Sequence, residues 1–497
     1  MRWLISFLLL IAPTSALAAW HKATSPHFVV YGEGTPESVR AYAEKLENFE
    51  QVLSAVTGFK TEPEANRLIV FLVENTNAVQ RQMGSRNDDI AGFYSPRLWG
   101  TIAVVPRRAG DGGPYALDPQ TVLFHEYAHH FMLQNAASAY PAWYVEGFAE
   151  YFSTTEFERD GSVSVGKPAS HRFYGLSVLP LFRVERMLNP DDRTLTPEQH
   201  EAFYGWSWLL THYLRYSAPR KGQFDKYLRA FADGASAADA AKGSFGTIAE
   251  LQADLTRYRD ARRLSYTQMK LTLAKPDIAV ATLSLSEGAA MPMFMRSYRA
   301  SNGKAAVDAV VVEARKLAAR FPSEPMALDA LAEFELDAEQ LDAAQRANTA
   351  VLAARPADGR ALMRNARIAE ARIKAPGTDA EWKAVRNLIV KANRAAPNDP
   401  FPLYAYYRWH AQSGTPTPAV AVDGLRRAIQ LAPQVPDLRF MLATKYIADG
   451  NKSAARSIMV PLLNDPHSAE MRQAARALLE GAKSIKPVET PTTQTKD

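Results

Sequence analysis

Between residues 20 and 108, short apolar runs alternate with one longer segment in which apolar residues recur every three or four positions. The longer segment predicts an amphipathic helix, with Thr35 as N-cap, Pro36 in the first turn and Gly58 at the end. The short runs are rich in apolar and aromatic residues and predict strands. They span residues 28–31, 68–73, 91–94 and 101–105. The pattern therefore predicts a region of the α+β class.

The following stretch is predicted to be mainly helical. Asp118 and Pro119 are typical of an N-cap and a first helical position, and they predict a helix that continues to about Gln134. This helix is apolar on nearly every side, which predicts that it is buried. A second helix is predicted to begin at Pro141. Further helices are predicted over residues 172–188, 199–216 and 223–233.

After about residue 285 the strand patterns disappear, and alanine, leucine and arginine dominate. Helical segments end near prolines that are 34, 41, 36 and 33 residues apart, at Pro322, Pro356, Pro397, Pro433 and Pro466. This spacing resembles tetratricopeptide repeats, in which pairs of antiparallel helices stack into a solenoid. The best single unit is Asp437 to Asp465, and residues 374–378 are a natural place for the extra residues of the longest interval. We therefore predict an all-α solenoid over residues 285–482; the alternative is an irregular helical bundle.

The two ends of the chain have their own patterns. Residues 1–18 resemble a secretory signal peptide, with Arg2, an apolar core over residues 3–12 and an A-x-A word that ends at Ala18. A retained membrane anchor is the weaker alternative, because the apolar run is about half of the ~20 residues that a span needs. Residues 483–497 are rich in Lys, Thr and Pro and are predicted to be a disordered tail.

Composition narrows the class of protein. A chain of 497 residues should hold two or more domains. The formal charge is only +5 and no basic run reaches five residues, so we expect no nucleic-acid partner. The sequence has no cysteine, which suits an oxidising compartment. We expect a periplasmic or secreted bacterial protein, with no stable membrane span once the signal has been cleaved.

The segment HEYAHHF carries the strongest chemical signal. His125 and His129 are four residues apart, so on a helix they share a face and can bind one metal ion. Glu126 lies beside the first histidine, where it can take a proton from a water molecule and later protonate a leaving amine. A chance HExxH on a core helix is the alternative interpretation.

A second segment, PAWYVEGFAE, strengthens the metal hypothesis. Glu146 lies 17 residues after His129 and supplies a third ligand from a second helix. Two imidazoles and a carboxylate suit Zn²⁺ with one open position. Glu150 is one turn beyond Glu146, and we predict that it accepts a hydrogen bond from the free ring nitrogen of His125.

Together, HEYAH and WYVEGFAEY resemble the gluzincin zinc peptidases, and within them the bacterial peptidase-MA-like group. The resemblance extends over about residues 20–265 and implies a thermolysin-like metallopeptidase domain over residues 19–270. It also implies that a tyrosine hydroxyl stabilises the oxyanion. Tyr204, which lies 58 residues after Glu146, is the first candidate, with Tyr213 and Tyr174 as alternatives.

The resemblance also sets expectations about the substrate. Aminopeptidases of this family have an upstream G-x-M-E-N word that binds the substrate amine, and the chain lacks it. We therefore expect an endopeptidase that acts on a peptide or protein, with Thr101 to Val105 as the edge strand that pairs with substrate backbone. The repeats would recruit substrate or a protein partner. The alternative function is a non-catalytic interaction scaffold with a vestigial peptidase domain.

Overall fold

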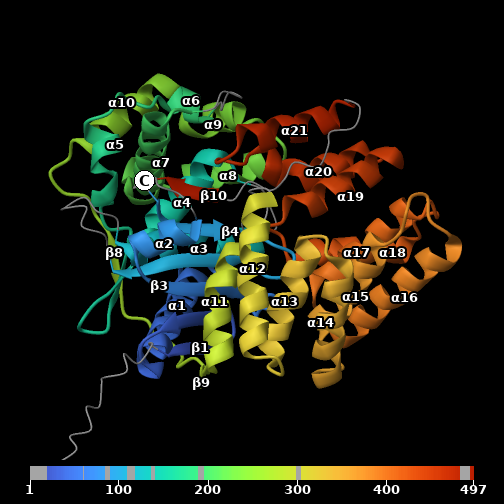
Figure 1. The fold of residues 1–497 in the computed structure, drawn as a ribbon. Coiled ribbons are helices and arrows are strands. Elements are labelled where there is room, and N and C mark those ends of the chain that lie inside the picture. The colour runs from blue at the N-terminus through green and yellow to red at the C-terminus, as the bar shows by residue number, and fades with distance from the viewer. Residues whose placement is uncertain are drawn as a thin grey trace, which may run out of the picture.

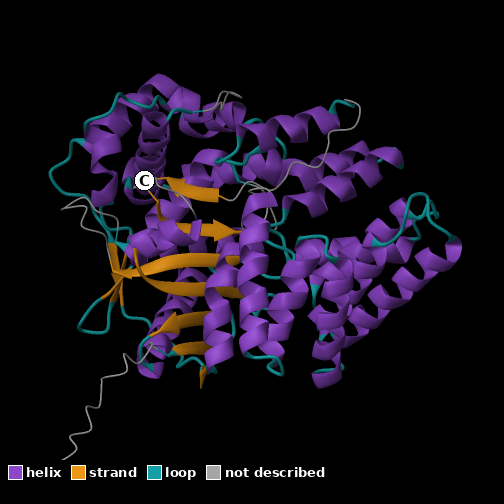
Figure 2. Cartoon of the chain, viewed as in Figure 1, coloured by secondary structure: helices purple, strands orange, loops and turns teal. Residues whose placement is uncertain are grey.

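The computed structural model describes residues 19–59, 61–83, 90–108, 118–135, 140–188, 195–297, 304–481 and 493–496 (Figures 1 and 2). The predicted signal peptide, residues 1–18, lies outside the described residues, as does most of the predicted tail. Within the described residues, no helix has both the length and the apolar character that a membrane crossing requires.

A seven-stranded mixed sheet organises the first half of the molecule, in the order β10-β4-β5-β3-β2-β1-β9. Strands β2, β3 and β5 are parallel to one another, whereas β1, β4, β9 and β10 pair antiparallel with their neighbours. The bounds are β1 Trp20–Thr24, β2 Phe28–Glu33, β3 Leu68–Asn75, β4 Ile90–Ser95, β5 Ile102–Arg108, β9 Ala279–Thr282 and β10 Thr493–Lys496. The four strands predicted from the sequence are all present, and the α+β class is confirmed.

Both faces of the sheet are covered by helices. Successive residues of a strand point to opposite sides, so strand β3 contributes side chains to the cores on both faces. Val70 and Leu72 of β3 pack in a core with α1 (Pro36–Thr57) and α3 (Pro119–Asn135). Phe71 and Val73 pack on the other face, against α11 (Leu285–Ser297), α12 (Lys304–Arg320) and α13 (Pro325–Asp337). Figure 1 shows α11 passing in front of the strands, with α12 and α13 beside it. Helices α11 to α13 therefore share a core with the sheet, and deleting them would expose an apolar sheet face.

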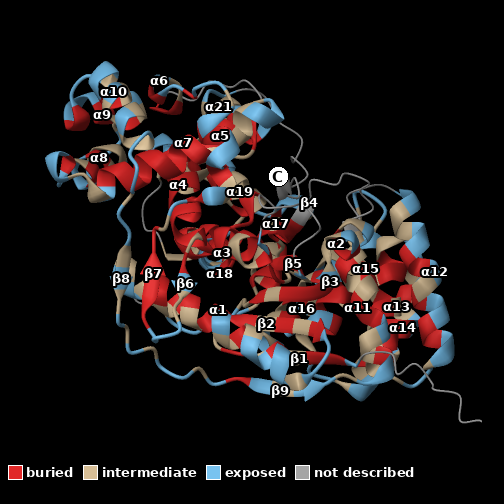
Figure 3. Cartoon of the chain, turned by 90° about the vertical axis from the view of Figure 1, so that its left-hand side faces the viewer, coloured by how far each residue is buried: buried red, intermediate tan, exposed pale blue. Residues whose placement is uncertain are grey.

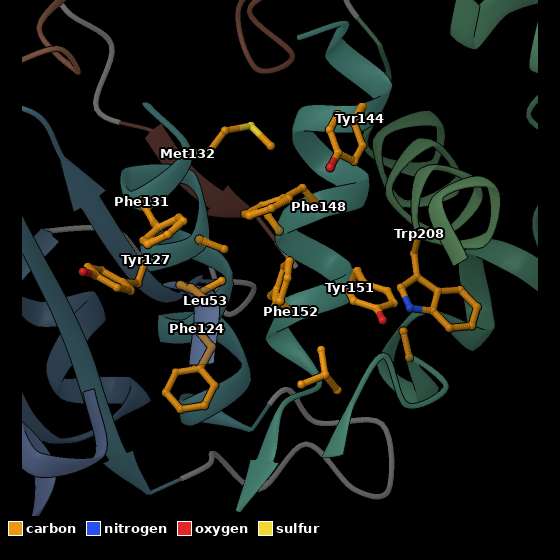
Figure 4. Packing of buried hydrophobic residues seen from close by; sticks show 14 of the residues in the cluster. Leu53, Phe124, Tyr127, Phe131, Met132, Tyr144, Phe148, Tyr151, Phe152 and Trp208 are labelled. Carbon is orange, nitrogen blue, oxygen red and sulfur yellow. The ribbon is translucent and has the colours of Figure 1, made fainter. Parts of the chain in front are cut away.

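The two helices that carry the motif residues are buried in the centre of the molecule (Figure 3). Helix α3 begins at Pro119, as predicted, and α4 (Ala142–Ser153) begins directly after Pro141. Aromatic side chains of both helices meet in one apolar cluster, which includes Phe124, Phe148 and Phe152 (Figure 4). The cluster fixes the position of α4 relative to α3.

Helix α7 (Pro197–Tyr216) packs closely on the other side of α4. The contact is made at Gly147, where an added Cβ would lie 2.1 Å from Oγ1 of Thr211 and 2.4 Å from the carbonyl oxygen of Ser207. Only glycine allows this approach, and the neighbouring residue on α4 is the predicted ligand Glu146. The close packing of α7 on α4 therefore determines how deeply Glu146 is buried.

We expect Gly147→Ala to destabilise the fold by about 1–3 kcal/mol, because the new methyl group overlaps backbone that cannot yield. Urea denaturation measures this change in unfolding free energy. The matched control is Gly243→Ala within helix α9 (Ala237–Phe245), where a Cβ meets nothing within 4 Å. There alanine should be neutral or stabilising by up to about 1 kcal/mol. Equal changes in unfolding free energy at the two glycines would contradict the interpretation that Gly147 permits the close packing of α7 on α4.

The predicted helix over residues 172–188 is wrong as a single element. The chain forms a 3₁₀ turn (Ser170–Arg172), α5 (Phe173–Ser177) and α6 (Val184–Leu188), with a break at Pro180. A proline disfavours helix at the preceding residue, which explains the break. Other elements are α2 Thr76–Met83, α8 Gln223–Ala232, α10 Ile248–Arg259 and a 3₁₀ turn at Ala218–Arg220. A small sheet contains β6 Glu156–Phe157, β7 Val163–Val165 and β8 Thr267–Met269.

The C-terminal half is a stack of tetratricopeptide-like helix pairs, as predicted. Four pairs pack most closely within themselves: α13 with α14 (Leu341–Ala354), α15 (Gly359–Ala371) with α16 (Asp379–Ala395), α17 (Pro400–Gln412) with α18 (Ala419–Leu431), and α19 (Pro436–Ala448) with α20 (Lys452–Leu463). Helix α21 (Ala469–Leu479) follows. The prolines that defined the spacing lie in the short connections between pairs, and the extra residues lie between α15 and α16.

The prediction that Thr101 to Val105 form a sheet edge is wrong. Strand β5 lies between β3 and β4, and β4 is the strand beyond it. The order differs because β4 precedes β5 in sequence and folds back onto it antiparallel, a pairing that apolar runs alone do not specify.

Part of the predicted disordered tail is also ordered in the structure. Residues Thr493–Lys496 form β10, which pairs antiparallel with β4 (Figure 1). An unpaired strand edge offers backbone donors and acceptors that any segment can use, whatever its composition. For the other residues of the tail, which lie outside the described part, disorder stays a prediction.

Candidate metal site

The predicted ligands come together at the contact between α3 and α4. His125 and His129 are one turn apart on α3, and their Nε2 atoms are 3.1 Å from each other. The Glu146 carboxylate on α4 faces both, with Oε2 at 3.5 Å from Nε2 of His125 and Oε1 at 3.5 Å from Nε2 of His129. The three residues offer ligand atoms that all lie within 4.8 Å of one another.

These separations match a single bound ion. Ligand atoms at about 2.0–2.2 Å from a tetrahedral ion lie roughly 3.3–3.6 Å from one another. The three measured separations, between 3.1 and 3.5 Å, fall close to that range. The rings of His125 and His129 are nearly perpendicular, at 86°, and their Nε2 atoms lie next to each other.

The electrostatics of the three residues also favour a bound cation. Glu146 is fully buried, and neither of its carboxylate oxygens has a hydrogen bond of good geometry among the described residues. Burial raises the pKa of Glu146, and burial lowers the pKa of His125 and brings that of His129 to about 4. The imidazoles are therefore neutral at pH 7, as ligands must be, and a buried carboxylate without a donor is costly unless a metal compensates it.

Glu150 supports the site from behind. Its Oε1 lies 3.1 Å from Nδ1 of His125, close to the predicted partner but without hydrogen-bond geometry, so the hydrogen bond itself stays a prediction. The same carboxylate accepts hydrogen bonds from Nε and Nη2 of Arg172 at 2.9 and 2.7 Å, and Oε2 lies 2.9 Å from Nε2 of His171. Although burial raises its pKa, Arg172 and the two histidines outweigh burial and hold the pKa of Glu150 well below its usual value. An ionised Glu150 fixes the proton of His125 on Nδ1 and leaves Nε2 free for a metal.

Tyr204 is the candidate tyrosine that the structure brings to the site. Its ring lies 6.2 Å from that of His125, and the Arg172 guanidinium stacks on it at 4.9 Å. Burial raises the pKa of Tyr204 well above its usual value, so the hydroxyl keeps its proton. Of the alternatives, the Tyr213 hydroxyl donates to Asp254 at 3.2 Å, and Tyr174 is on the surface.

Glu126 is buried beside His125 on α3. Burial is the main reason why the pKa values of Tyr94 and Tyr204 are raised, and the charge of Glu126 adds to both effects. The charge of Glu126 is thus close enough to Tyr94 on β4 and to Tyr204 on α7 to act on both. His130 contacts Glu64, with Nε2 3.1 Å from Oε2, and its Nδ1 lies 3.0 Å from the Tyr94 hydroxyl.

Three residues of the site were not anticipated from the sequence: His171, Arg172 and His467. The first two follow α4 and have no motif of their own, although a buried Glu150 predicts that some cation must pair with it. His467 lies in the connection between α20 and α21, where its Nε2 is 3.2 Å from Oε1 of Glu146. Nothing in the spacing of the repeats distinguishes that histidine.

No model of a known protein family matches this chain, and no curated protein matches it. Among solved structures, a thermophilic TPR protein of Thermus thermophilus is similar, with 19% identity and a TM-score of 0.30. That similarity covers 35% of this chain and 92% of the other.

Proposed function

We propose that the protein is a metal-dependent peptidase, most simply a zinc peptidase of the gluzincin type, which cleaves peptide bonds within a peptide or protein. The observation that carries the proposal is the spacing of the ligand atoms of His125, His129 and Glu146 around one point, in a buried cluster that also contains Glu126. Two imidazoles and a carboxylate form a typical catalytic zinc set that leaves a position open.

Each residue has a distinct task in the proposed reaction. His125, His129 and Glu146 would hold the ion, and Glu150 would orient His125. A bound zinc ion would polarise the scissile carbonyl and make a water molecule more acidic. Glu126 would take the proton from that water and transfer it to the leaving amine. Tyr204 would donate a hydrogen bond to the oxygen on which negative charge develops.

The missing G-x-M-E-N word supports an endopeptidase, because the chain lacks that means of binding a substrate's free amine. Strand β4 lies next to the motif helix α3, with which it is in contact, but it already pairs with both β5 and β10. Backbone pairing of a substrate with β4 would therefore require β10 to leave. We further propose that the protein is exported and that the helix pairs bind substrate or a protein partner.

The first test is the metal content of the purified protein and its action on a mixture of peptides, followed by mass spectrometry. About one zinc per chain with cleavage between internal residues supports the proposal. A protein that takes up no metal even after incubation with excess zinc would refute it, and would leave the interaction scaffold as the better interpretation.

Tyr204→Phe tests the oxyanion assignment. We expect kcat to fall about 10²–10³-fold, because one preorganised donor is lost, while the metal content stays unchanged. Tyr213→Phe is the matched control, since that hydroxyl bonds to Asp254 away from the ligands. If the two variants cleave peptides at the wild-type rate, Tyr204 has no part in the reaction.

A further inference from the structure

The repeat region returns to the candidate metal site near its end. The connection between α20 and α21, residues 464–468, contacts the ligand cluster through His467. Nε2 of His467 lies 3.2 Å from Oε1 of Glu146, and Nδ1 lies 3.5 Å from the Tyr204 hydroxyl. The ring is perpendicular to that of His129, at 89°, with 5.2 Å between the centroids. A third imidazole thus lies beside the ligand cluster, in contact with Glu146, while the group of ligand atoms that all lie within 4.8 Å of one another comprises His125, His129 and Glu146.

The connection holds His467 firmly in this place. Oδ1 of Asp465 accepts hydrogen bonds from the backbone amides of His467 and Ser468, both at 2.8 Å. Nη1 of Arg472 donates to the carbonyl oxygen of Asp465 at 2.7 Å, and Ser468 caps α21 through the amide of Met471 at 3.0 Å. These bonds fix the backbone on both sides of the histidine, so its approach to Glu146 follows from the local structure.

We propose that His467 is the fourth protein ligand of the metal site. The separation between its Nε2 and Oε1 of Glu146 is close to that expected for two ligands of one tetrahedral ion, roughly 3.3 Å. The inference rests on the proposed function, because it assumes that His125, His129 and Glu146 bind the ion.

A fourth protein ligand changes what the site can do. Four protein ligands close a zinc site, whereas a catalytic site keeps one position for water or substrate. The resting protein would therefore cleave only slowly, because each turnover would require His467 to leave. The connection is attached to α20 and α21, so a partner or substrate that moves these helices would open the site.

The test that needs no variant is X-ray absorption at the zinc edge of the full-length protein loaded with one zinc ion. Scattering from imidazole rings counts the histidine ligands. Three rings support the proposal; two rings overturn it and leave the three-residue site intact. A protein that binds no zinc overturns both this inference and the proposed function.

The second test uses His467→Ala in the full-length chain, with affinity for zinc measured by competition with a chelator and the Co²⁺ form followed by visible absorption. We expect about tenfold weaker binding or more, and a changed Co²⁺ spectrum. His410→Ala is the matched control: His410 is a buried histidine of the repeat region, whereas His467 is partly exposed, and His410 contacts Thr415 in the connection that follows α17. Wild-type affinity and an unchanged spectrum in His467→Ala would overturn the proposal. His467→Gln, with circular dichroism, separates loss of the ligand from loss of the fold.

Discussion

Glu126→Gln is expected to keep the metal and lose about 10²–10⁴-fold in kcat, the usual contribution of a general base. Glutamine has the shape of glutamate, so the buried position beside His125 should be filled as before. It cannot accept the proton of the attacking water, and the reaction then depends on solvent alone. Cleavage of a peptide mixture, with zinc measured on the same sample, gives both quantities.

This variant should be made in two backgrounds, because His467 is proposed to close the site. In the wild-type background, a low cleavage rate can arise because His467 occupies the open position of the metal. In the His467→Ala background that position is free, so the full decrease in kcat caused by Glu126→Gln must appear. The control is Glu64→Gln, which removes a carboxylate on the His130 side of α3 and should leave the rate unchanged. If Glu126→Gln cleaves peptides as fast as its parent protein in both backgrounds, the mechanism with Glu126 as general base is excluded.

The elements around the site could be predicted from local signals. Proline at the start of α3 and before α4 marked both helices, and four apolar runs marked strands. The spacing of His125 and His129 places them on one face of any helix, so their proximity needed no knowledge of the fold. Glu146 could be added because a helix with its own glutamate pattern followed at a short distance.

The remaining parts depend on contacts between distant segments, which local patterns do not encode. The position of β5 inside the sheet follows from how β4 folds back, and the shared core of the sheet with α11 to α13 follows from the alternate face of β3. His467 is the strongest example. It occupies an ordinary repeat connection, and only the packing of distant segments brings that connection to Glu146.

Loss of Glu146 should have the largest effect on metal binding. We expect Glu146→Ala to weaken zinc by more than the roughly 10–100-fold that loss of an outer partner costs, because a ligand itself is removed. In the wild type, zinc at about 100 times its dissociation constant should raise the free energy of unfolding by about 2.7 kcal/mol. In Glu146→Ala the same zinc concentration should give almost no increase. Thermal or urea unfolding with and without zinc measures the difference.

The free energies of unfolding of the metal-free proteins provide a second check on the role of Glu146. Burial raises the pKa of Glu146, so its carboxylate destabilises the metal-free fold at neutral pH, and this penalty disappears as the pH falls through that pKa. Metal-free Glu146→Ala should therefore be no less stable than metal-free wild type at pH 7, with the balance moving toward wild type in acid. Glu150→Gln is the matched variant, one turn along α4, and should retain zinc with about 10–100-fold lower affinity. If zinc stabilises Glu146→Ala as much as the wild type, Glu146 is not a ligand, and the pairing of His467 with its carboxylate is an ion pair alone.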